Sequence, residues 1–282
     1  MEKIALITDS ASDVPSDLIK EYDIRVLPFR IIYKDRELID GVDITPEEVY
    51  ENMVNEIPTT SLPSMDDMEK LFQTLENEGY NKAIAITLSS GLSGIYNALK
   101  IAADNHPEIE TFIWDSKSIS VGEAVVVFEC GKLIKMGKSF QEIKEYIPTI
   151  LQRSNLFFVV GTLENLKKGG RIGKVAGTIA ELLDIKPIIS PDKNDGKYFT
   201  YAKIRGRKKS LNKLLEIAEE VAKDKKCRAF LMHGNALAEA LEFANRLKTL
   251  PNILSVYFGG NISPVAGVHS GPGLVGLCLL EE

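Results

Sequence analysis

Residues 89–94, Ser-Ser-Gly-Leu-Ser-Gly, have the composition of an anion-binding turn. The six residues before them, 82–87, suit a buried parallel strand, and residues 94–105 have the pattern of a helix. A turn of serines and glycines at such a junction directs hydroxyls, backbone N–H groups and the positive end of the helix dipole at one point. Ser93 and the Gly94 N–H are therefore candidate ligands for an anion, with a simple helix cap as the alternative role of Ser93.

Two further hydroxyl-bearing residues, Thr60 and Ser61, lie between Pro58 and Pro63. Proline restricts its own φ and disfavours the helical region for the residue before it, so we expect a stiff polar loop. Hydroxyls that are already held in place lose little entropy on binding, and they therefore suit recognition of a carboxylate. An ordinary polar loop is the alternative.

A basic residue and a histidine lie in glycine-rich segments. Arg171 belongs to residues 167–174, which lack the order of a nucleotide P-loop but contain glycines that let the backbone approach an anion. His269 belongs to residues 267–273, an expected loop, where an imidazole could hydrogen-bond an acid or handle a proton. A solvated turn and a structural histidine are the alternatives. His106 is expected in an exposed turn.

Ser93 and His269 together also suggest a serine hydrolase, which is the competing enzyme class. A nucleophile elbow has the order Gly-x-Ser-x-Gly on a strand–turn–helix unit. Residues 91–95 read Gly-Leu-Ser-Gly-Ile, so Ile95 stands where the last glycine belongs. Hydrolysis of an acyl ester therefore remains the less favoured interpretation.

Four aspartates, Asp9, Asp13, Asp40 and Asp115, lie at predicted strand ends and turns. Their spacing matches neither a metal site nor an acid–base pair, and each is expected to cap a turn or a helix. Three cysteines and three histidines, far apart in the chain, match no metal site and no disulfide framework. We therefore expect no metal and no cofactor.

Charge and hydropathy exclude several classes of protein. The 282 residues carry a net charge of −6, with 44% hydrophobic and 26% charged residues, which suits a globular protein and does not suit a nucleic-acid-binding surface. No apolar run reaches the roughly 18 residues of a membrane-spanning helix, and the first residues show no signal-peptide pattern. These features predict a cytoplasmic protein. A basic cluster at residues 205–209, with Arg205 and Arg207, is either a solvated face or a docking site for an acidic partner.

Alternating strands and helices must position these residues. Up to about residue 152, the order β-α-β-α-β-α predicts a parallel sheet with helices on both faces. The ligand site of such a sheet lies at the carboxyl ends of its strands, where residues 9–10, 89–94 and 115–116 all fall.

The second half has a different pattern, in which hairpins are mixed with helices. We expect an α+β domain with a largely antiparallel sheet over residues 153–282. The change of pattern suggests two domains, residues 1–152, which carry the anion-binding loops, and residues 153–282. Within the first half, residues 25–33 and 37–39 are expected to pair as a hairpin.

Taken in order, six motifs resemble those of the DegV family of fatty-acid-binding proteins, and the resemblance covers the whole chain. Each motif alone is weak, but six in this order are specific, and the chain shows no clear departure from the pattern. The motifs are residues 7–10 (Ile-Thr-Asp-Ser), 40–41 (Asp-Gly), 59–64 (Thr-Thr-Ser-Leu-Pro-Ser), 89–94, 163–172 and 267–273.

The resemblance implies a two-domain protein that holds one long-chain fatty acid in the cleft between its domains. Some family members are the acyl-presenting subunit of a bacterial fatty-acid kinase, in which a separate protein phosphorylates the bound carboxylate for phospholipid synthesis. Such a protein is not itself an enzyme, and its membrane contact is at most transient. By motif match, the carboxylate site consists of Thr60, Ser61, Ser93, the Gly94 N–H, Arg171 and His269.

The acyl tail needs an apolar slot, for which the sequence offers several candidates. These are the apolar faces of the helices expected at 94–105, 120–136 and 175–183. A sensor for some other small carboxylate is a further alternative, because a polar site of this kind does not require a long tail.

Overall fold

The computed structural model describes residues 2–178 and 185–282. Its first half is built on a four-stranded sheet with the order β2-β1-β6-β7, in which every neighbouring pair is parallel. The two central strands are buried and apolar, as expected when helices cover both faces of a parallel sheet. The strands are β1 (Ile4–Asp9), β2 (Ile24–Leu27), β6 (Lys82–Thr87) and β7 (Glu110–Asp115).

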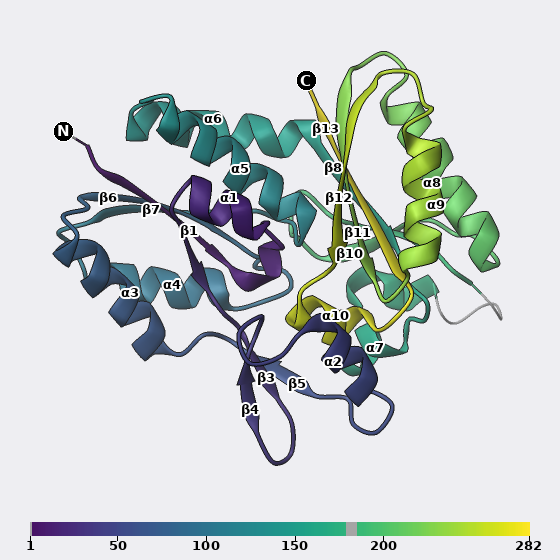
Figure 1. Cartoon of the computed structure of the whole chain (residues 1–282), viewed down its shortest axis with the longest axis horizontal. Coiled ribbons are helices and arrows are strands. Elements are labelled where there is room, and N and C mark those ends of the chain that lie inside the picture. Colours follow the sequence, from purple (N-terminus) through teal and green to yellow (C-terminus); the bar gives the residue numbers. More distant parts are fainter. Residues whose placement is uncertain (1, 179–184) are drawn as a thin grey trace.

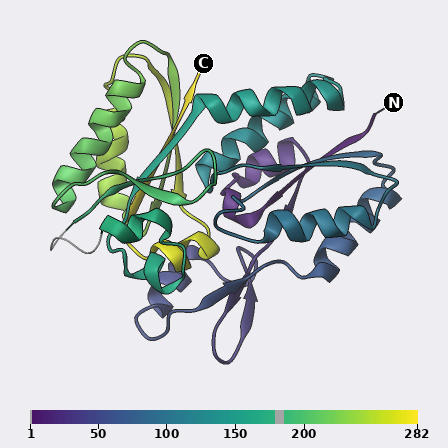
Figure 2. The same ribbon diagram turned by 180° about the vertical axis from the view of Figure 1, so that it is seen from behind.

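Helices cover both faces of this sheet (Figure 1). On one face lie α3 (Met65–Asn77) and α4 (Ile95–Asp104), which are side by side in the view from behind (Figure 2). On the other face lie α1 (Ser16–Glu21), α5 (Val121–Lys135) and α6 (Phe140–Arg153). The prediction of a parallel sheet between two helical layers is confirmed.

A small antiparallel sheet, β4-β3-β5, projects from the first half next to α2 (Pro46–Asn52). Its strands show that two predictions were wrong in part. Residues 25–33 are not one strand, because Pro28 separates β2 from β3 (Arg30–Ile32), and only β3 pairs with β4 (Glu37–Ile39). The expected loop between two prolines contains β5 (Thr59–Ser61), in which Thr60 pairs with Ile31 of β3.

The second half is built on a six-stranded sheet with the order β10-β9-β8-β13-β11-β12. Every neighbouring pair is antiparallel except β11–β12, so the predicted α+β arrangement is confirmed. α8 (Arg207–Val221) and α9 (Leu237–Leu247) cover the face turned away from the first half (Figure 1). The domain division at residue 152 stays a prediction. The strands are β8 (Ser154–Val159), β9 (Ile188–Pro191), β10 (Tyr198–Ala202), β11 (Cys227–Gly234), β12 (Ile253–Asn261) and β13 (Leu274–Glu281).

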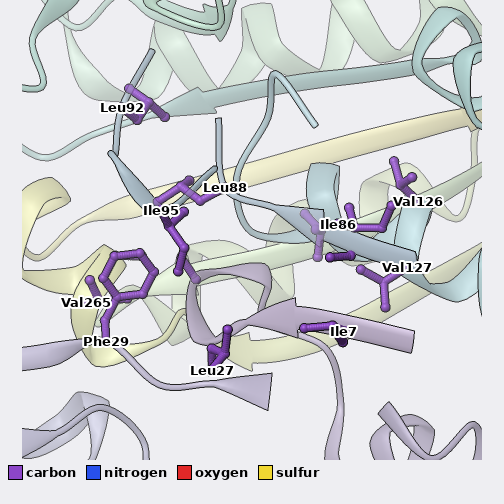
Figure 3. Close-up of a cluster of buried hydrophobic side chains, with 14 of the residues drawn as sticks. Ile7, Leu27, Phe29, Ile86, Leu88, Leu92, Ile95, Val126, Val127 and Val265 are labelled. Atoms are coloured by element: carbon purple, nitrogen blue, oxygen red, sulfur yellow. The ribbon is translucent and has the colours of Figure 1, made fainter. Parts of the chain in front are cut away.

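Helix α5 lies between the two large sheets. It contacts β1 and β6 on one side and β8, β11 and β13 on the other. The segment from Val121 to Val127 is buried throughout, as expected for a helix that is apolar on all sides. One apolar core therefore runs across both halves: Figure 3 shows Phe29 against Val265, a residue of the second half, with Ile95 pointing toward the same place.

A short helix, α10 (Pro264–Ser270), forms where a glycine-rich loop was expected at 267–273. Proline at its first position presets φ for a helix, and α10 packs against α2 and against α7 (Glu164–Lys168). Gly267 is needed because a Cβ there would lie 2.9 Å from the Tyr50 Oη of α2. The helix expected at 175–183 lies partly outside the described residues, and the described part forms a short 3-10 helix over Gly173–Thr178.

His106 is buried, so the expectation of an exposed turn was wrong. Its Nδ1 lies 2.8 Å from a carboxylate oxygen of Glu76 and its Nε2 lies 2.9 Å from one of Glu69, both on α3, and its ring stacks on Phe72. Burial acts to lower the pKa of His106, but the two carboxylates prevail and raise it above its ordinary value. The imidazolium therefore ties the end of α4 to α3.

We expect His106→Gln to destabilise the protein by about 1 kcal/mol near pH 6, because the glutamine amide can serve only one of the two partly exposed carboxylates. The pKa of His106 is raised in the folded state, so its contribution is complete below its unfolded pKa and is lost as the pH rises through the folded one. Urea unfolding of both proteins at about pH 6 and about pH 9 tests this. An equal difference at both values would contradict it.

Candidate functional site

A cavity with mostly apolar walls lies where the two halves meet. It contains about 780 Å³ of empty space, including its opening to solvent. The first half contributes Ala11, Phe29, Leu88, Leu92, Ile119 and Val121, among others. The second half contributes Leu156, Phe158, Leu166, Tyr198, Met232, Ile262, Val265, Ala266 and Leu274, among others.

Four of the six predicted site residues line this cavity. Thr60 is on β5, Ser93 precedes α4, Arg171 follows α7 and His269 is on α10. Thr60 Oγ1 lies 2.8 Å from His269 Nε2, so two elements far apart in the chain meet at one polar point. The geometry thus supports the convergence of these four side chains.

The other two predicted residues are adjacent in the chain but do not line the cavity. Ser61 is exposed, and its hydroxyl donates to the Leu62 carbonyl at 3.3 Å. Gly94 is exposed at the start of α4. Their contact with a ligand carboxylate stays a prediction.

The serines of the turn at 89–94 have different contacts: Ser93 lines the cavity, whereas Ser89 contacts the turn between β9 and β10. Ser93 Oγ accepts the N–H of Ile95, the first residue of α4, at 3.3 Å, and Ser93 also lines the cavity, whereas the N-cap residue of α4 is Gly94. Ser89 is fully buried and donates to the Gly196 carbonyl at 2.9 Å, which joins the first half to the β9–β10 turn. A Cβ at Gly91 would lie 2.4 Å from the Asp195 carbonyl oxygen, so only glycine fits under that turn.

Arg171 supports the same turn from the other side. Its Nε donates to the Leu92 carbonyl at 3.2 Å and its Nη1 donates to the Gly169 carbonyl at 2.6 Å. Among the described residues that line the cavity, Arg171 alone carries a permanent positive charge. It therefore both shapes the polar end and makes it attractive to an anion.

His269 is neutral at pH 7 in this environment. Burial lowers its pKa, and the nearby Arg171 charge lowers it further, to about 4. Its Nδ1 is buried and has no hydrogen-bond partner among the described residues. The polar end thus offers one guanidinium, two hydroxyls and a neutral imidazole, which matches a single carboxylate better than a multiply charged phosphate.

The arrangement does not favour a serine hydrolase. A catalytic serine needs a base within hydrogen-bond reach, and that base needs an orienting group. His269 Nε2 bonds to Thr60 rather than to Ser93, and no described acid bonds to its Nδ1.

The residues of the apolar cavity wall are the part of the site that sequence reasoning missed. Among the described residues, the cavity walls include none of α4 itself and only Val121 of α5. Most of the apolar wall comes from strand ends, α10 and the second sheet. The sequence identifies these residues only as hydrophobic, and no motif marks them as part of a cavity. The described residues contain no group of side chains arranged to hold a metal ion and no helix long and apolar enough to cross a membrane.

The two arginines of the predicted basic cluster differ in their surroundings. Arg205 is exposed just before α8. Arg207 is half-buried, and its Nη2 pairs with Glu239 of α9 at 2.7 Å. Arg205 is therefore the better candidate for contact with a partner.

Comparison with known proteins identifies the family. The DegV family model matches residues 3–282. The chain belongs to the DegV family. A DegV domain-containing protein of Clostridium acetobutylicum is 60% identical over 282 residues, with 100% of each chain covered.

Solved DegV structures share the fold. A DegV family protein of Thermus thermophilus, described by its fatty acid binding, has a TM-score of 0.92 at 26% identity, with 99% of this chain and 100% of that chain covered. A stearic acid-binding protein of Eubacterium ventriosum has a TM-score of 0.88 at 28% identity, with 100% and 98% covered.

We expect the ring nitrogens of His269 in the lipid-free protein to titrate at about pH 4. The imidazole is uncharged above that pKa, so its signals stay those of the neutral form at neutral pH. Long-range ¹H–¹⁵N spectra of protein labelled in histidine would show this, with His106 as the internal contrast because its pKa is raised. A His269 midpoint near about 6.5, the ordinary histidine value, would overturn the burial argument.

Proposed function

We propose that this DegV chain binds one long-chain fatty acid in the cavity between its halves and presents the carboxylate to a separate kinase, which converts it to an acyl phosphate. The observation that carries the proposal is that Thr60, Ser93, Arg171 and His269 all line one cavity with mostly apolar walls, where Thr60 and His269 are in hydrogen-bond contact. The fatty acid binding of related structures supports it.

The two parts of the cavity have different energetic roles. Burial of about 16 acyl carbons at ~0.8 kcal/mol per CH₂ gives a gross contribution above about 10 kcal/mol, from which ordering and association subtract a large part. The polar end adds the hydrogen bonds that select a carboxylate. The tail therefore supplies most of the affinity, and the head group sets the orientation.

The protein in this proposal is a carrier and not the catalyst. Residues 1–152 hold most of the carboxylate ligands and residues 153–282 close the cavity, so the two domains act together. We propose a cytoplasmic location, no cofactor, and at most transient contact with a membrane. The resemblance to acyl-presenting kinase subunits, together with the exposed Arg205, supports the kinase partner.

We expect Ser93→Ala and Thr60→Val each to lower the affinity for stearic acid about tenfold, because each loses a hydrogen bond to a charged carboxylate. Solvent extraction with mass spectrometry, beside native mass spectrometry of the intact protein, measures the bound acyl chain. Ser90→Ala is the matched control, since Ser90 is exposed in the same turn and does not line the cavity.

Other outcomes would point elsewhere. Unchanged loading in both variants would contradict the carboxylate assignment. Binding of short acids with no preference for long chains would favour the small-carboxylate sensor. Acyl-ester turnover that disappears in Ser93→Ala would favour the hydrolase.

For the kinase contact, we expect Arg205→Glu to reduce acyl-phosphate formation by the partner kinase at least about tenfold, while stearic acid binding is unchanged, because a reversed charge repels an acidic docking surface. Lys100→Glu, an exposed charge reversal on α4, is the control and keeps the wild-type rate. Arg207→Glu is less informative, because it also breaks the pair with Glu239. Equal kinase rates for wild type and Arg205→Glu would remove this docking site.

A further inference from the structure

Two aspartates of the first half, the buried Asp40 and the half-buried Asp13, accept backbone N–H groups at the start of α10. Asp13 Oδ1 accepts the Ser263 N–H at 2.7 Å, and Asp40 Oδ1 accepts the Val265 N–H at 3.0 Å. These bonds join positions 250 and 225 residues apart in the chain. They fix the helix that carries His269 to the loops after β1 and β4.

The second oxygen of each carboxylate is held by a serine hydroxyl. Ser120 Oγ bonds to Asp13 Oδ2, and Ser10 Oγ bonds to Asp40 Oδ2. A carboxyl group that carries a proton keeps both contacts, since Oδ1 still accepts the N–H and the Oδ2 hydroxyl donates to the serine oxygen. The geometry therefore accommodates either protonation state.

Within residues 2–178 and 185–282, neither Asp13 nor Asp40 forms an ion pair with a lysine or arginine. Arg228 of β11 lines a second cavity together with Asp13, but its guanidinium pairs with Glu129 and Glu282. The other titratable groups on the surrounding elements are acidic or neutral: Asp9 of β1, Asp17 of α1, Glu47 and Tyr50 of α2, Glu123 of α5, His233 of β11, Tyr257 of β12 and His269 of α10.

The groups that these aspartates hold belong to the cavity wall. Ser120 and Val265 both line the cavity, as do His269 and Ser270 farther along α10. Ser120 has φ 56° and ψ −138°, a conformation that non-glycine residues rarely adopt, and its contacts with Asp13 and the Ala11 carbonyl keep it there. Loss of these bonds would therefore release part of the wall.

We propose that Asp13 and Asp40 are positioning residues that set α10, and through it His269, and that binding of an acyl chain in the cavity is linked to uptake of protons by this pair. The proposal rests on the fatty-acid role proposed above. It assigns a proton-sensitive role to carboxylates that do not themselves touch the ligand.

The sign of the linkage follows from burial. Burial raises the pKa of Asp40 to about 7 and that of Asp13 to about 6, although the serine and backbone donors oppose it. Filling the cavity with an acyl chain removes further water from the wall that these carboxyls hold, so binding raises both pKa values further and favours the protonated forms. Affinity for an acyl chain is then highest below about pH 6, falls as the pH rises above about 6 to 7, and levels off above the pKa values of the complex.

Asparagine is the informative substitution. Its amide reproduces the protonated carboxyl, because the oxygen accepts the N–H of α10 and the NH₂ donates to the serine. We expect Asp40→Asn and Asp13→Asn/Asp40→Asn to bind stearic acid at about pH 8.5 as tightly as wild type binds at about pH 5.5. Wild type loses about tenfold in affinity relative to the double variant over that range, which corresponds to a rise of about one unit in the pKa of one carboxyl on binding.

The measurement is the partition of radiolabelled stearic acid between lipid-free protein and phosphatidylcholine vesicles. The carboxyl group of stearic acid also ionises with pH, but its effect on partition is the same for wild type and variant and cancels when the two profiles are compared. Asp115→Asn is the matched control: Asp115 also ends a strand and accepts two backbone N–H groups, but it pairs with Lys117 and lies outside the cavity. It should keep the wild-type slope.

A second measurement does not depend on the variants folding. Calorimetric titration of wild type with stearic acid, in two buffers of different ionisation enthalpy, reports proton uptake directly, and we expect uptake near pH 7. Binding without proton uptake, or a wild-type slope in Asp40→Asn, would overturn the linkage alone. Failure of wild type to bind stearic acid at any pH would overturn the proposed function and the linkage with it.

Discussion

The hydrogen bond between Thr60 and His269 joins residues 209 positions apart, and the polar end of the cavity exists only where their two elements meet. β5 is placed by its pairing with β3, and α10 is placed by Asp13 and Asp40. A buried hydroxyl or imidazole without a partner is costly in an apolar surrounding, so this bond also stabilises the cavity before any ligand enters it. The site is thus a product of the assembled halves and not of either one.

Arg171 shows how such a site can hold a carboxylate without sequestering it. Two of its nitrogens are engaged by the Leu92 and Gly169 carbonyls, so its charge acts on the cavity while its geometry is fixed by the backbone. A carboxylate near this charge is stabilised without the closed bidentate pair that a free guanidinium forms. In the function proposed here, the acyl tail supplies most of the affinity, so the head group would remain available for reaction with another protein.

The parts of the fold that could be predicted from the sequence are those with a local pattern, such as a capping box or a regular alternation of strands and helices. Helices at Thr45, Ser64 and Ser139 begin at capping boxes that can be read from four residues, and the alternation of strands and helices gave the parallel sheet. β5 and α10 were predicted as loops because their proline and glycine content outweighed long-range pairing and packing that no local pattern records. The apolar wall of the cavity was missed for the same reason, since its residues come from elements that are distant in the chain.

The aspartates at the strand ends show how the assembled fold sets the pKa of a carboxyl group. Asp9 ends β1 and Asp115 ends β7, the two strands that flank β6 in the same parallel sheet. Each carboxylate accepts two backbone N–H groups. Burial acts to raise the pKa of both, but Lys117 and the donors around Asp115 prevail there and lower it, whereas the pKa of Asp9 rises to about 7. Position in the sheet is therefore not what sets ionisation. The end of β1 is buried, and no lysine or arginine of the described residues pairs with Asp9. A residue that the sequence identifies only as a turn carboxylate therefore has a pKa near neutrality.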